Sequence, residues 1–248
     1  MSLPHWRLPP KQLMLDHSDA VHVWRSLLDL PGEYVDRLAD SLSAAERTRA
    51  DRFRFEPDRR RFIAAHGILR SILSRYLIDR RPADLCFVYN AYGKPALDQA
   101  VDDLDLSFSV SHSHDLAVYA ITCGREVGID VEYIRPDLAE ERIAERFFAP
   151  SEVAALRQLP KSSQPEAFFA CWTRKEAYLK GLGEGLARPL NEFEIAVRPG
   201  EVNAEVKTRD DATSQWSLHE IYPGSGYVAA LAVAGPIGPL SFWQWPVL

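Results

Sequence analysis

The amino-acid sequence predicts an α+β protein composed of two similar halves. Short stretches of alternating apolar and polar residues, typical of strands, are interleaved with amphipathic helical stretches along the 248 residues. Hydrophobic residues make up 46% of the chain and charged residues 26%, so there are enough apolar side chains for a sizeable core. The order helix, longer helix, strand occurs twice, and we therefore divide the chain into residues 1–122 and 123–248.

A weak internal repeat supports this division. At an offset of 106 positions, three places match: 44–46 with 150–152, 62–64 with 168–170, and Phe87 with Phe193. The identity is low, so chance matching is the alternative. If the two halves are related, the cleft between them is the expected ligand site.

The first half begins with a proline-rich stretch, to about Ser18, that we expect to be extended. Alternation predicts a strand at Val21–Leu27. Ser43 and Glu46 have the spacing of a capping box, and Asp58 is expected to cap a longer helix. The apolar face of that longer helix consists of Phe62, Ile63, Ile68, Leu69, Ile72, Leu73 and Leu77. Further strands are predicted at Leu85–Tyr89, Leu106–Val110 and Leu116–Thr122.

The second half opens with another alternating stretch, which predicts a strand at Val127–Tyr133. Helices are predicted near residues 138–148, 150–159 and 165–181. Proline and glycine divide the tail, residues 193–245, into short segments, and we expect several strands there.

The charge of the chain limits its binding partners. The formal net charge of −6 argues against a general electrostatic grip on nucleic acid. Between Arg47 and Arg81, however, eleven arginines stand against four acidic residues. Such a local positive excess suits a polyanionic small molecule or an acidic partner.

The cysteines and the apolar runs predict the compartment. Cys86, Cys123 and Cys171 are too far apart for a metal cluster or a disulfide framework, so we expect free thiols in a reducing cytosol. No apolar stretch approaches the roughly 18 residues of a membrane span, and the N-terminus lacks the apolar core of a signal peptide. We therefore expect a cytoplasmic protein without a membrane partner.

Two carboxylates lie side by side in the strand predicted at Val127–Tyr133. Asp130 and Glu132 fall on the same side of that strand, about 6.5–7 Å apart. Neighbouring carboxylates repel each other unless a cation or a base lies between them. The alternative is a strand whose acidic side faces water, and the pair alone does not distinguish the two.

A third carboxylate favours a metal site. The predicted helix 165–181 places four residues in one i, i+4 column: Phe168, Trp172, Glu176 and Lys180. With Trp172 in the core, Glu176 and Lys180 project from the same face, although such Glu–Lys pairs are also common on helix surfaces. If Glu176 meets the two strand carboxylates, three hard oxygen ligands suit Mg²⁺, which also recruits phosphate oxygens.

Ser111-His112-Ser113-His114-Asp115 lies at a strand end, where side chains and backbone N–H groups can meet an anion. A zinc site would need further Cys or His ligands, and a serine hydrolase would need a GxSxG elbow; neither is present. A structural histidine and phosphate binding by His112 with a serine hydroxyl are the two interpretations left. Gly93, Lys94 and Pro95 predict a turn that presents one lysine.

Four motifs in this order resemble the Sfp-type 4′-phosphopantetheinyl transferases. They are Gly93-Lys94-Pro95, Phe108-Ser109-Val110-Ser111-His112-Ser113, Val127-Gly128-Ile129-Asp130-Val131-Glu132 and Trp172-Thr173-Arg174-Lys175-Glu176-Ala177-Tyr178-Leu179-Lys180. The last motif fits the pattern WxxKExxxK. No single motif is diagnostic, but the four together are, because they occur in the right order and at compatible spacing. With Arg49–Arg70 and Arg146-Phe147-Phe148 they span most of the chain.

The resemblance implies a fold and an activity. In this family two similar α+β halves, in a pseudo-twofold arrangement, form a cleft for coenzyme A and Mg²⁺, with Mn²⁺ as a substitute. The enzyme transfers 4′-phosphopantetheine from coenzyme A to a serine of an apo acyl, peptidyl or polyketide carrier protein and releases adenosine 3′,5′-bisphosphate. Such carriers serve fatty acid, polyketide and nonribosomal peptide synthesis. We expect the enzyme to act as a monomer.

The resemblance also implies roles for individual residues. Three carboxylates would hold Mg²⁺ against the pyrophosphate: Asp130, Glu132 and Glu176. Three side chains would contact phosphate oxygens: Ser111, His112 and Lys180. Lys180 would also assist the departing oxygen of adenosine 3′,5′-bisphosphate. Val131 has no side-chain oxygen and would leave one coordination site to water.

The remaining roles concern the adenine end and the base. Three basic residues would meet the 3′-phosphate and adenine, together with the turn residues Gly93 and Pro95: Arg49, Arg61 and Lys94. The sequence does not distinguish which of the neighbours Arg59, Arg60 and Arg61 points inward. Glu152 matches the general base proposed for the family, and a metal-bound water is the alternative.

Two other functional classes are less favoured. A different Mg²⁺-dependent phospho- or nucleotidyl transferase should carry a nucleotide signature, and neither GxxxxGK[ST] nor GxGxxG occurs. A catalytically idle module that only binds coenzyme A or carrier proteins should have lost at least one of the site residues, and all of them are present.

Overall fold

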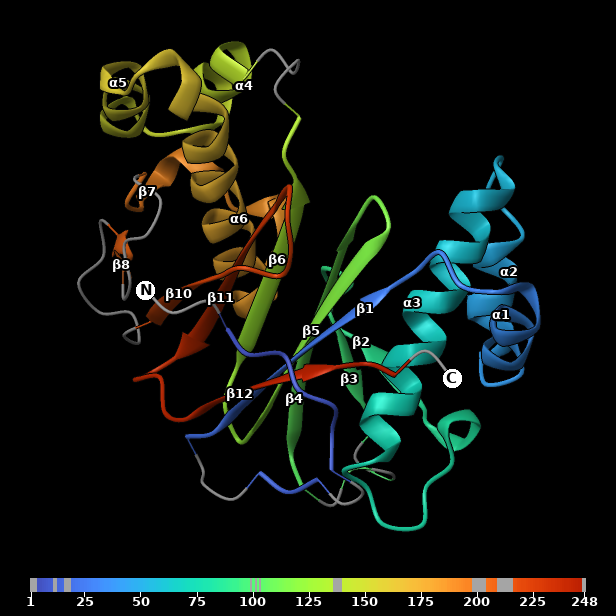
Figure 1. Ribbon diagram of the computed structural model, residues 1–248. Helices are drawn as coiled ribbons and strands as arrows, with labels where there is room; N and C mark the ends of the chain where they lie inside the picture. The colour runs from blue at the N-terminus through green and yellow to red at the C-terminus, as the bar shows by residue number, and fades with distance from the viewer. Residues whose placement is uncertain are drawn as a thin grey trace.

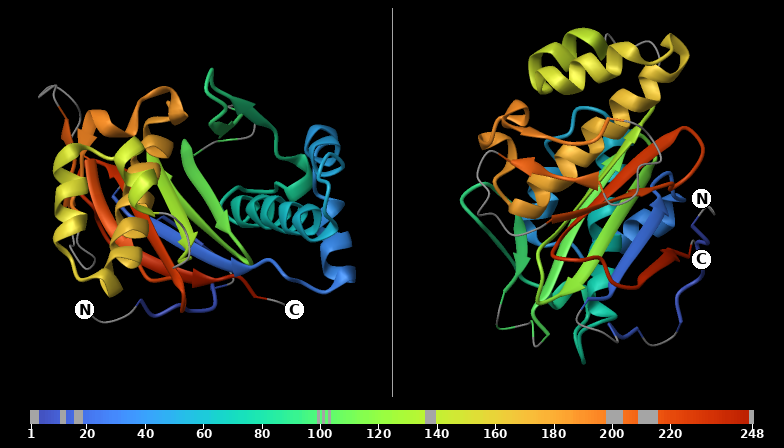
Figure 2. Two further views of the ribbon diagram at one scale, coloured as in Figure 1. Left: turned by 90° about the horizontal axis from the view of Figure 1, so that it is seen from above. Right: turned by 90° about the vertical axis from the view of Figure 1, so that its left-hand side faces the viewer.

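The computed structural model describes residues 4–10, 13–15, 19–98, 100, 102, 104–135, 140–197, 204–208 and 216–246. It has an α+β architecture, with helices on both sides of two four-stranded sheets (Figures 1 and 2). This confirms the fold class predicted from the sequence.

The first sheet has the strand order β12-β1-β5-β4. Its members are β1 (Val21–Leu27), β4 (Leu106–Ser113), β5 (Leu116–Cys123) and β12 (Leu240–Gln244). β5 pairs antiparallel with both β1 and β4, whereas β12 pairs parallel with β1. The last strand of the chain thus completes a sheet made from the first half, and the division at residue 122 stays a prediction.

The second sheet has the order β6-β11-β10-β8 and is antiparallel throughout. Its members are β6 (Val127–Tyr133), β8 (Ala204–Glu205), β10 (Trp216–Ile221) and β11 (Tyr227–Ala234). Two small ribbons complete the strands: β2 (Phe87–Tyr89) with β3 (Pro95–Leu97), and β7 (Phe193–Glu194) with β9 (Lys207–Thr208).

Six α-helices occur in the described residues, three before and three after the central strands. They are α1 (Gly32–Ala39), α2 (Ala44–Ala50), α3 (Glu56–Ser74), α4 (Glu140–Phe147), α5 (Pro150–Gln158) and α6 (Gln164–Leu182). Short 3₁₀ turns lie at Pro82–Asp84, Lys161–Ser163, Gly185–Ala187 and Leu190–Glu192. α3 and α6 both have 19 residues and follow α2 and α5, so the predicted order of helix and longer helix is present in both halves. No helix in the described part of the chain is long and apolar enough to cross a membrane.

The elements form layers. Helices α1–α3 lie on one side of the strands and α4–α6 on the other (Figures 1 and 2). One apolar core lies between α1–α3 and the first sheet, a second between the two sheets, and a third between the second sheet and α6. β5 and β11 are buried along almost their whole length because both of their faces are covered.

Of the two helix caps predicted from the sequence, one is present and one is not. The capping box of Ser43 and Glu46 is present at the start of α2. α3 begins at Glu56 with proline in its first turn, so Asp58 lies inside that turn and is not the cap. α1 was not predicted, because its eight residues are too few for a clear apolar period.

Other boundaries moved by a few residues. β4 continues to Ser113, three residues beyond the predicted strand, and β2 begins at Phe87. α4 covers residues 140–147, and the start predicted at 138 lies outside the described residues, as do parts of the arm predicted up to Ser18.

Candidate functional site

The predicted metal ligands come from β6 and α6, and a glycine contact brings these two elements together. A Cβ atom on Gly128 of β6 would lie 1.9 Å from the Ala177 carbonyl oxygen and 2.4 Å from the Gly181 nitrogen of α6. Only glycine therefore permits this approach. The contact places the helix face that carries Glu176 and Lys180 against the strand that carries the other two carboxylates.

Lys180, Asp130 and Ser111 form one hydrogen-bonded group. The Lys180 ammonium lies 2.7 Å from Asp130 Oδ1 and 2.8 Å from Ser111 Oγ, and the Ser111 hydroxyl donates to the same Asp130 oxygen at 2.7 Å. Asp130 is buried, and its second oxygen, Oδ2, has no hydrogen-bond partner among the residues that the structure describes. A buried carboxylate oxygen without a partner is costly, so this atom is poised to accept a cation or a donor.

Glu132 and Glu176 lie close enough to Asp130 for its charge to raise their pKa values. Burial, with repulsion from Asp130, raises the pKa of Glu132, although a hydrogen bond from Ser113 to Glu132 Oε2 opposes the shift. Burial, together with repulsion from Asp130 and Glu132, raises the pKa of Glu176 to about 7. The structure thus brings the three predicted carboxylates into one electrostatic cluster.

The donor set of this cluster fits a hard divalent cation. Within the described residues, no three His, Cys, Asp or Glu side chains are arranged so that they could hold a metal ion. The ammonium of Lys180, rather than a metal ion, pairs with Asp130 in this structure. Three carboxylates with one unpartnered buried oxygen nevertheless supply the oxygen ligands that Mg²⁺ takes, with water or phosphate completing the shell. Their role as ligands remains a prediction.

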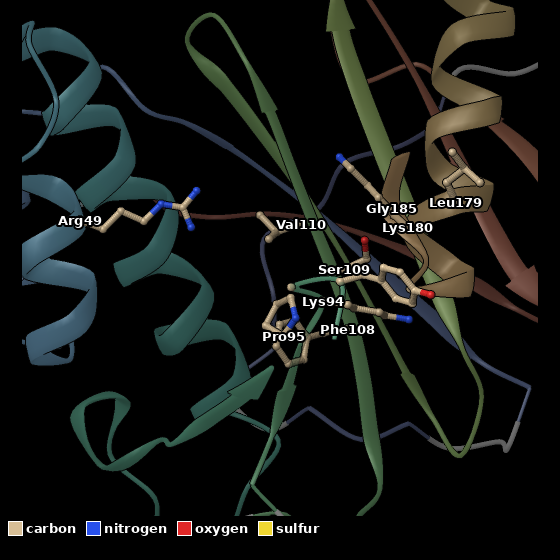
Figure 3. A pocket seen from close by; sticks show the side chains of 12 residues that line it. Arg49, Lys94, Pro95, Phe108, Ser109, Val110, Leu179, Lys180 and Gly185 are labelled. Atoms are coloured by element: carbon tan, nitrogen blue, oxygen red, sulfur yellow. The ribbon is translucent and has the colours of Figure 1, made fainter. Parts of the chain in front are cut away.

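A pocket of about 380 Å³ lies next to the cluster. Five of the predicted residues line it: Arg49, Gly93, Lys94, Pro95 and Lys180. Figure 3 shows Arg49 extending from α2 on one side and Lys180 from α6 on the other, with β4 between them. The pocket therefore lies between the helices of the first half and α6 of the second.

The turn that carries Lys94 is tied to the end of α6. The Lys94 ammonium forms an ion pair with Glu126 and donates to the Gly181 carbonyl oxygen at 2.7 Å, and Asn90 Nδ2 donates to the Gly183 carbonyl oxygen at 2.8 Å. Gly93 has a φ of +87°, which favours glycine in the turn. Lys94 lines the pocket, but its charge is already paired.

The predicted arginines differ in their placement. Arg49 lies in the pocket and stacks its guanidinium over the Phe62 ring at 5.4 Å. Arg61 is not a lining residue; its guanidinium forms two hydrogen bonds, of 2.8 and 3.0 Å, with Asp29. Arg60 donates to the Leu30 carbonyl oxygen.

Four basic side chains lie close enough to His112 to affect its pKa. Partial desolvation in the cleft lowers its pKa to about 4, and charge repulsion adds to the effect. The repelling groups are His66, Lys180, Arg49 and Arg61. An anion at this point would be surrounded by donors and positive charge.

Glu152 lies apart from this cluster. Its side chain is buried between α5 and α6, where it pairs with Lys175, and it does not line the pocket. The structure thus brings together the predicted metal and phosphate residues but not the predicted base.

Three residues that contribute to the site were given no role of their own from the sequence. Tyr92 and Ser109 line the pocket, and Ser113 holds Glu132. The signal for the serines was available, because Ser107, Ser109, Ser111 and Ser113 alternate along one strand and so share a face.

Two family models match the chain. The model described as the 4′-phosphopantetheinyl transferase superfamily matches residues 126–232, and the model of the N-terminal part of 4′-phosphopantetheinyl transferases matches residues 32–124.

Curated relatives cover most of the chain. The 4′-phosphopantetheinyl transferase HetI of Nostoc sp. is 44% identical over 98% of this chain and 100% of its own length. A putative 4′-phosphopantetheinyl transferase of Synechocystis sp. is 35% identical over 71% of this chain and 70% of its own. The 4′-phosphopantetheinyl transferase Sfp of Bacillus subtilis is 31% identical over 85% of this chain and 90% of its own.

Proposed function

The chain belongs to the 4′-phosphopantetheinyl transferase superfamily and is a transferase of the Sfp type, and on this premise we propose its reaction in detail. It transfers the phosphopantetheine group of coenzyme A to a serine of an apo carrier protein, requires Mg²⁺, and releases adenosine 3′,5′-bisphosphate. The observation that carries this proposal is the convergence of three carboxylates and Lys180 beside a basic pocket.

The pocket supports coenzyme A as the co-substrate. Coenzyme A carries a pyrophosphate and a 3′-phosphate, so its binding site needs positive charge at separate points. Lys180, His112 and Ser111 are assigned to the pyrophosphate. Lys180 donates to Ser111, and its charge contributes to the lowered pKa of His112. Arg49 lies across the pocket and is assigned to the 3′-phosphate and adenine end, with Gly93, Lys94 and Pro95 forming the wall. Arg61 is assigned to the same end; it must first exchange Asp29 for phosphate.

The carboxylate cluster supports the Mg²⁺ requirement. Asp130, Glu132 and Glu176 would hold the ion, and Lys180 would exchange its contact with Asp130 for a phosphate oxygen. When bound, Mg²⁺ would offset the charge of the pyrophosphate and so let a hydroxyl approach phosphorus. Mn²⁺ has similar ligand preferences and is the expected substitute.

The side chains of the chain supply positioning and charge. Lys180 stabilises the departing oxygen of adenosine 3′,5′-bisphosphate, and His112 orients the phosphate being transferred. The hydroxyl of the carrier serine must lose its proton to a general base. The resemblance to the family assigns this role to Glu152. The buried contacts of Glu152 favour the alternative, in which the proton acceptor lies within the cleft.

The partners follow from the same proposal. We propose apo carrier proteins of fatty acid, polyketide or nonribosomal peptide synthesis as the acceptors, and a monomer acting in the cytoplasm without nucleic-acid or membrane partners. The net charge of −6 supports the first exclusion.

The direct test is intact mass spectrometry of an apo carrier protein incubated with the enzyme, coenzyme A and Mg²⁺. The carrier should gain the mass of one phosphopantetheine group, and chromatography should show adenosine 3′,5′-bisphosphate in equal amount. Chelation of Mg²⁺ should stop the reaction, and Mn²⁺ should restore it. Asp130→Asn should abolish transfer, whereas Asp36→Asn, on the exposed face of α1, should not. Transfer that persists without any divalent ion would refute the Mg²⁺ requirement.

A further inference from the structure

β4 and β6 are edge strands of two different sheets, yet they lie against each other. β4 ends the order β12-β1-β5-β4, and β6 ends the order β6-β11-β10-β8. Within the described residues, no backbone ladder joins the two strands. Side-chain hydroxyls bridge them instead, from three alternate positions of β4: Ser109, Ser111 and Ser113.

The first two serines bond different kinds of group on β6. Ser109 Oγ accepts the Ile129 N–H at 3.1 Å, so it replaces a backbone carbonyl as the acceptor. The Ser111 hydroxyl donates to Asp130 Oδ1 at 2.7 Å. Alternation along the strand places both side chains on the same face of β4.

Ser113 binds both a carboxylate and a backbone N–H group of β6 through its one hydroxyl oxygen. Its hydroxyl donates to Glu132 Oε2 at 2.7 Å and accepts the Tyr133 N–H at 3.1 Å. A serine hydroxyl has one donor and two acceptor lone pairs, so both bonds can exist at once. The carboxylate is thereby held by a group that the backbone of its own strand keeps in place.

The hydrogen bond leaves the other oxygen of Glu132 available. Within the described residues, Oε1 has no hydrogen-bond partner, and Glu132 lies close enough to Asp130 and Glu176 for their charges to interact. Fixing Oε2 removes the rotational freedom by which the carboxylate could turn away from its neighbours.

We propose that Ser113 is a positioning residue that holds Glu132 for the divalent cation and, with Ser109, locks the edge of the second half to the first. This inference rests on the proposed function, since it assigns Glu132 to the cation. Ser113 does not touch the substrate; it acts through Glu132. Groups that orient metal ligands in this way typically affect metal affinity or activity by about 10–100-fold when they are removed.

A pair of variants isolates the hydroxyl. Ser113→Thr keeps the hydroxyl. Ser113→Val introduces a side chain of the same shape as threonine but without the hydroxyl. Ser107→Ala is the matched control, because Ser107 lies on the same strand and its side chain makes no hydrogen bond to a described residue. If Ser113→Val does not fold, Ser113→Ala replaces it, since alanine has no extra methyl groups to accommodate.

Two measurements are made on each protein. The first is amide hydrogen exchange of the metal-free protein, which reports the Tyr133 N–H directly. The second is a Mg²⁺ titration of transfer to an apo carrier protein at saturating coenzyme A. Ser113→Val should lose protection at Tyr133 and need about 10-fold or more Mg²⁺ for half-maximal transfer, with a maximal rate near that of the unmodified enzyme. Ser113→Thr and Ser107→Ala should behave as the unmodified enzyme in both.

The outcomes separate this inference from the proposed function. Unchanged protection of Tyr133 in Ser113→Val overturns the lock, whatever the enzyme does. Lost protection with an unchanged Mg²⁺ titration overturns the positioning role and leaves Ser113 as a purely structural joint. If the unmodified enzyme transfers nothing, or needs no divalent ion, the proposed function fails, and the positioning role fails with it, while the exchange data still decide the lock.

Discussion

The ammonium of Lys175 lies 2.8 Å from Glu152 Oε2, and both side chains are almost completely buried, with 0% and 3% exposure. Lys175 also donates to the carbonyl oxygens of Leu190 and Phe193, both at 2.7 Å, which uses all three of its protons. The Glu152 carboxylate accepts the N–H groups of Ala149 and Ile195 as well. The pair therefore joins α5, α6 and the segment that follows them.

Glu152→Gln should destabilise the protein more than it slows the reaction. The substitution leaves the Lys175 charge buried without its counter-charge, and breaking a buried pair in this way costs about 3–5 kcal/mol. Urea unfolding measures this cost, with Glu166→Gln, an exposed carboxylate at the start of α6, as the control. A variant of normal stability whose transfer rate is about 10²–10⁴ lower would restore Glu152 as the general base.

Glu176 should make the metal-free protein less stable as the pH rises. Burial and its acidic neighbours raise its pKa from 4.5 to about 7, so between these values the folded state binds more protons than the unfolded state. Stability then falls with rising pH through this window. Thermal unfolding in a chelator, from pH 4 to 8, should show a smaller fall for Glu176→Gln. A slope equal to that of the unmodified protein would contradict the clustered carboxylates, and the exposed Glu192→Gln is the control.

Glu46 should make the protein more stable as the pH rises, which is the opposite of the effect of Glu176. Burial opposes its ionisation, but hydrogen bonds from His66, Arg70 and Ser43 prevail and lower its pKa to about 2. A carboxyl whose folded pKa is below its unfolded value stabilises the fold above the unfolded pKa, and this is lost as the pH falls from 4.5 towards 2. The shift corresponds to about 3 kcal/mol.

Glu46→Gln should therefore lower stability at neutral pH and flatten the acid limb of unfolding. It should also weaken coenzyme A binding, because Glu46 connects α2, which carries Arg49, to α3 through the buried Arg70. Isothermal titration of coenzyme A checks the second effect. Thr48→Ala is the control, since its hydroxyl bonds only within α2. An unchanged acid limb would show that Glu46 is not ion-paired as described.

His112 should gain a proton when a phosphate enters the cleft. Desolvation and the surrounding positive charges lower its pKa to about 4, and a bound anion would offset those charges. Proton NMR of the imidazole, with and without adenosine 3′,5′-bisphosphate, should show the pKa rising. His219 lies on β10, and its pKa is lowered by burial without a contribution from positive groups, so it serves as the internal control. Equal shifts at both histidines would point to a general effect of the ligand.

The sequence by itself predicted most of the elements and the candidate residues of the site. Alternation placed Asp130 and Glu132 on one side of a strand, and the i, i+4 spacing placed Glu176 and Lys180 on one side of a helix. The capping box of Ser43 and Glu46 could also be predicted from the spacing of the two residues. These features depend on neighbours within a few positions, where the backbone period alone decides which way a side chain points.

Tertiary structure decided which partner each charged group takes. Lys94 is paired with Glu126, Arg61 with Asp29, and Lys175 with Glu152, although the sequence offers other partners for each. Such choices depend on how distant segments pack, down to single contacts such as Gly128 of β6 against α6. A local period fixes the side of an element on which a residue lies, but only the packing of one element on another fixes the few ångströms that make a hydrogen bond, and so Glu152 lies in the core while Lys180 reaches the cleft.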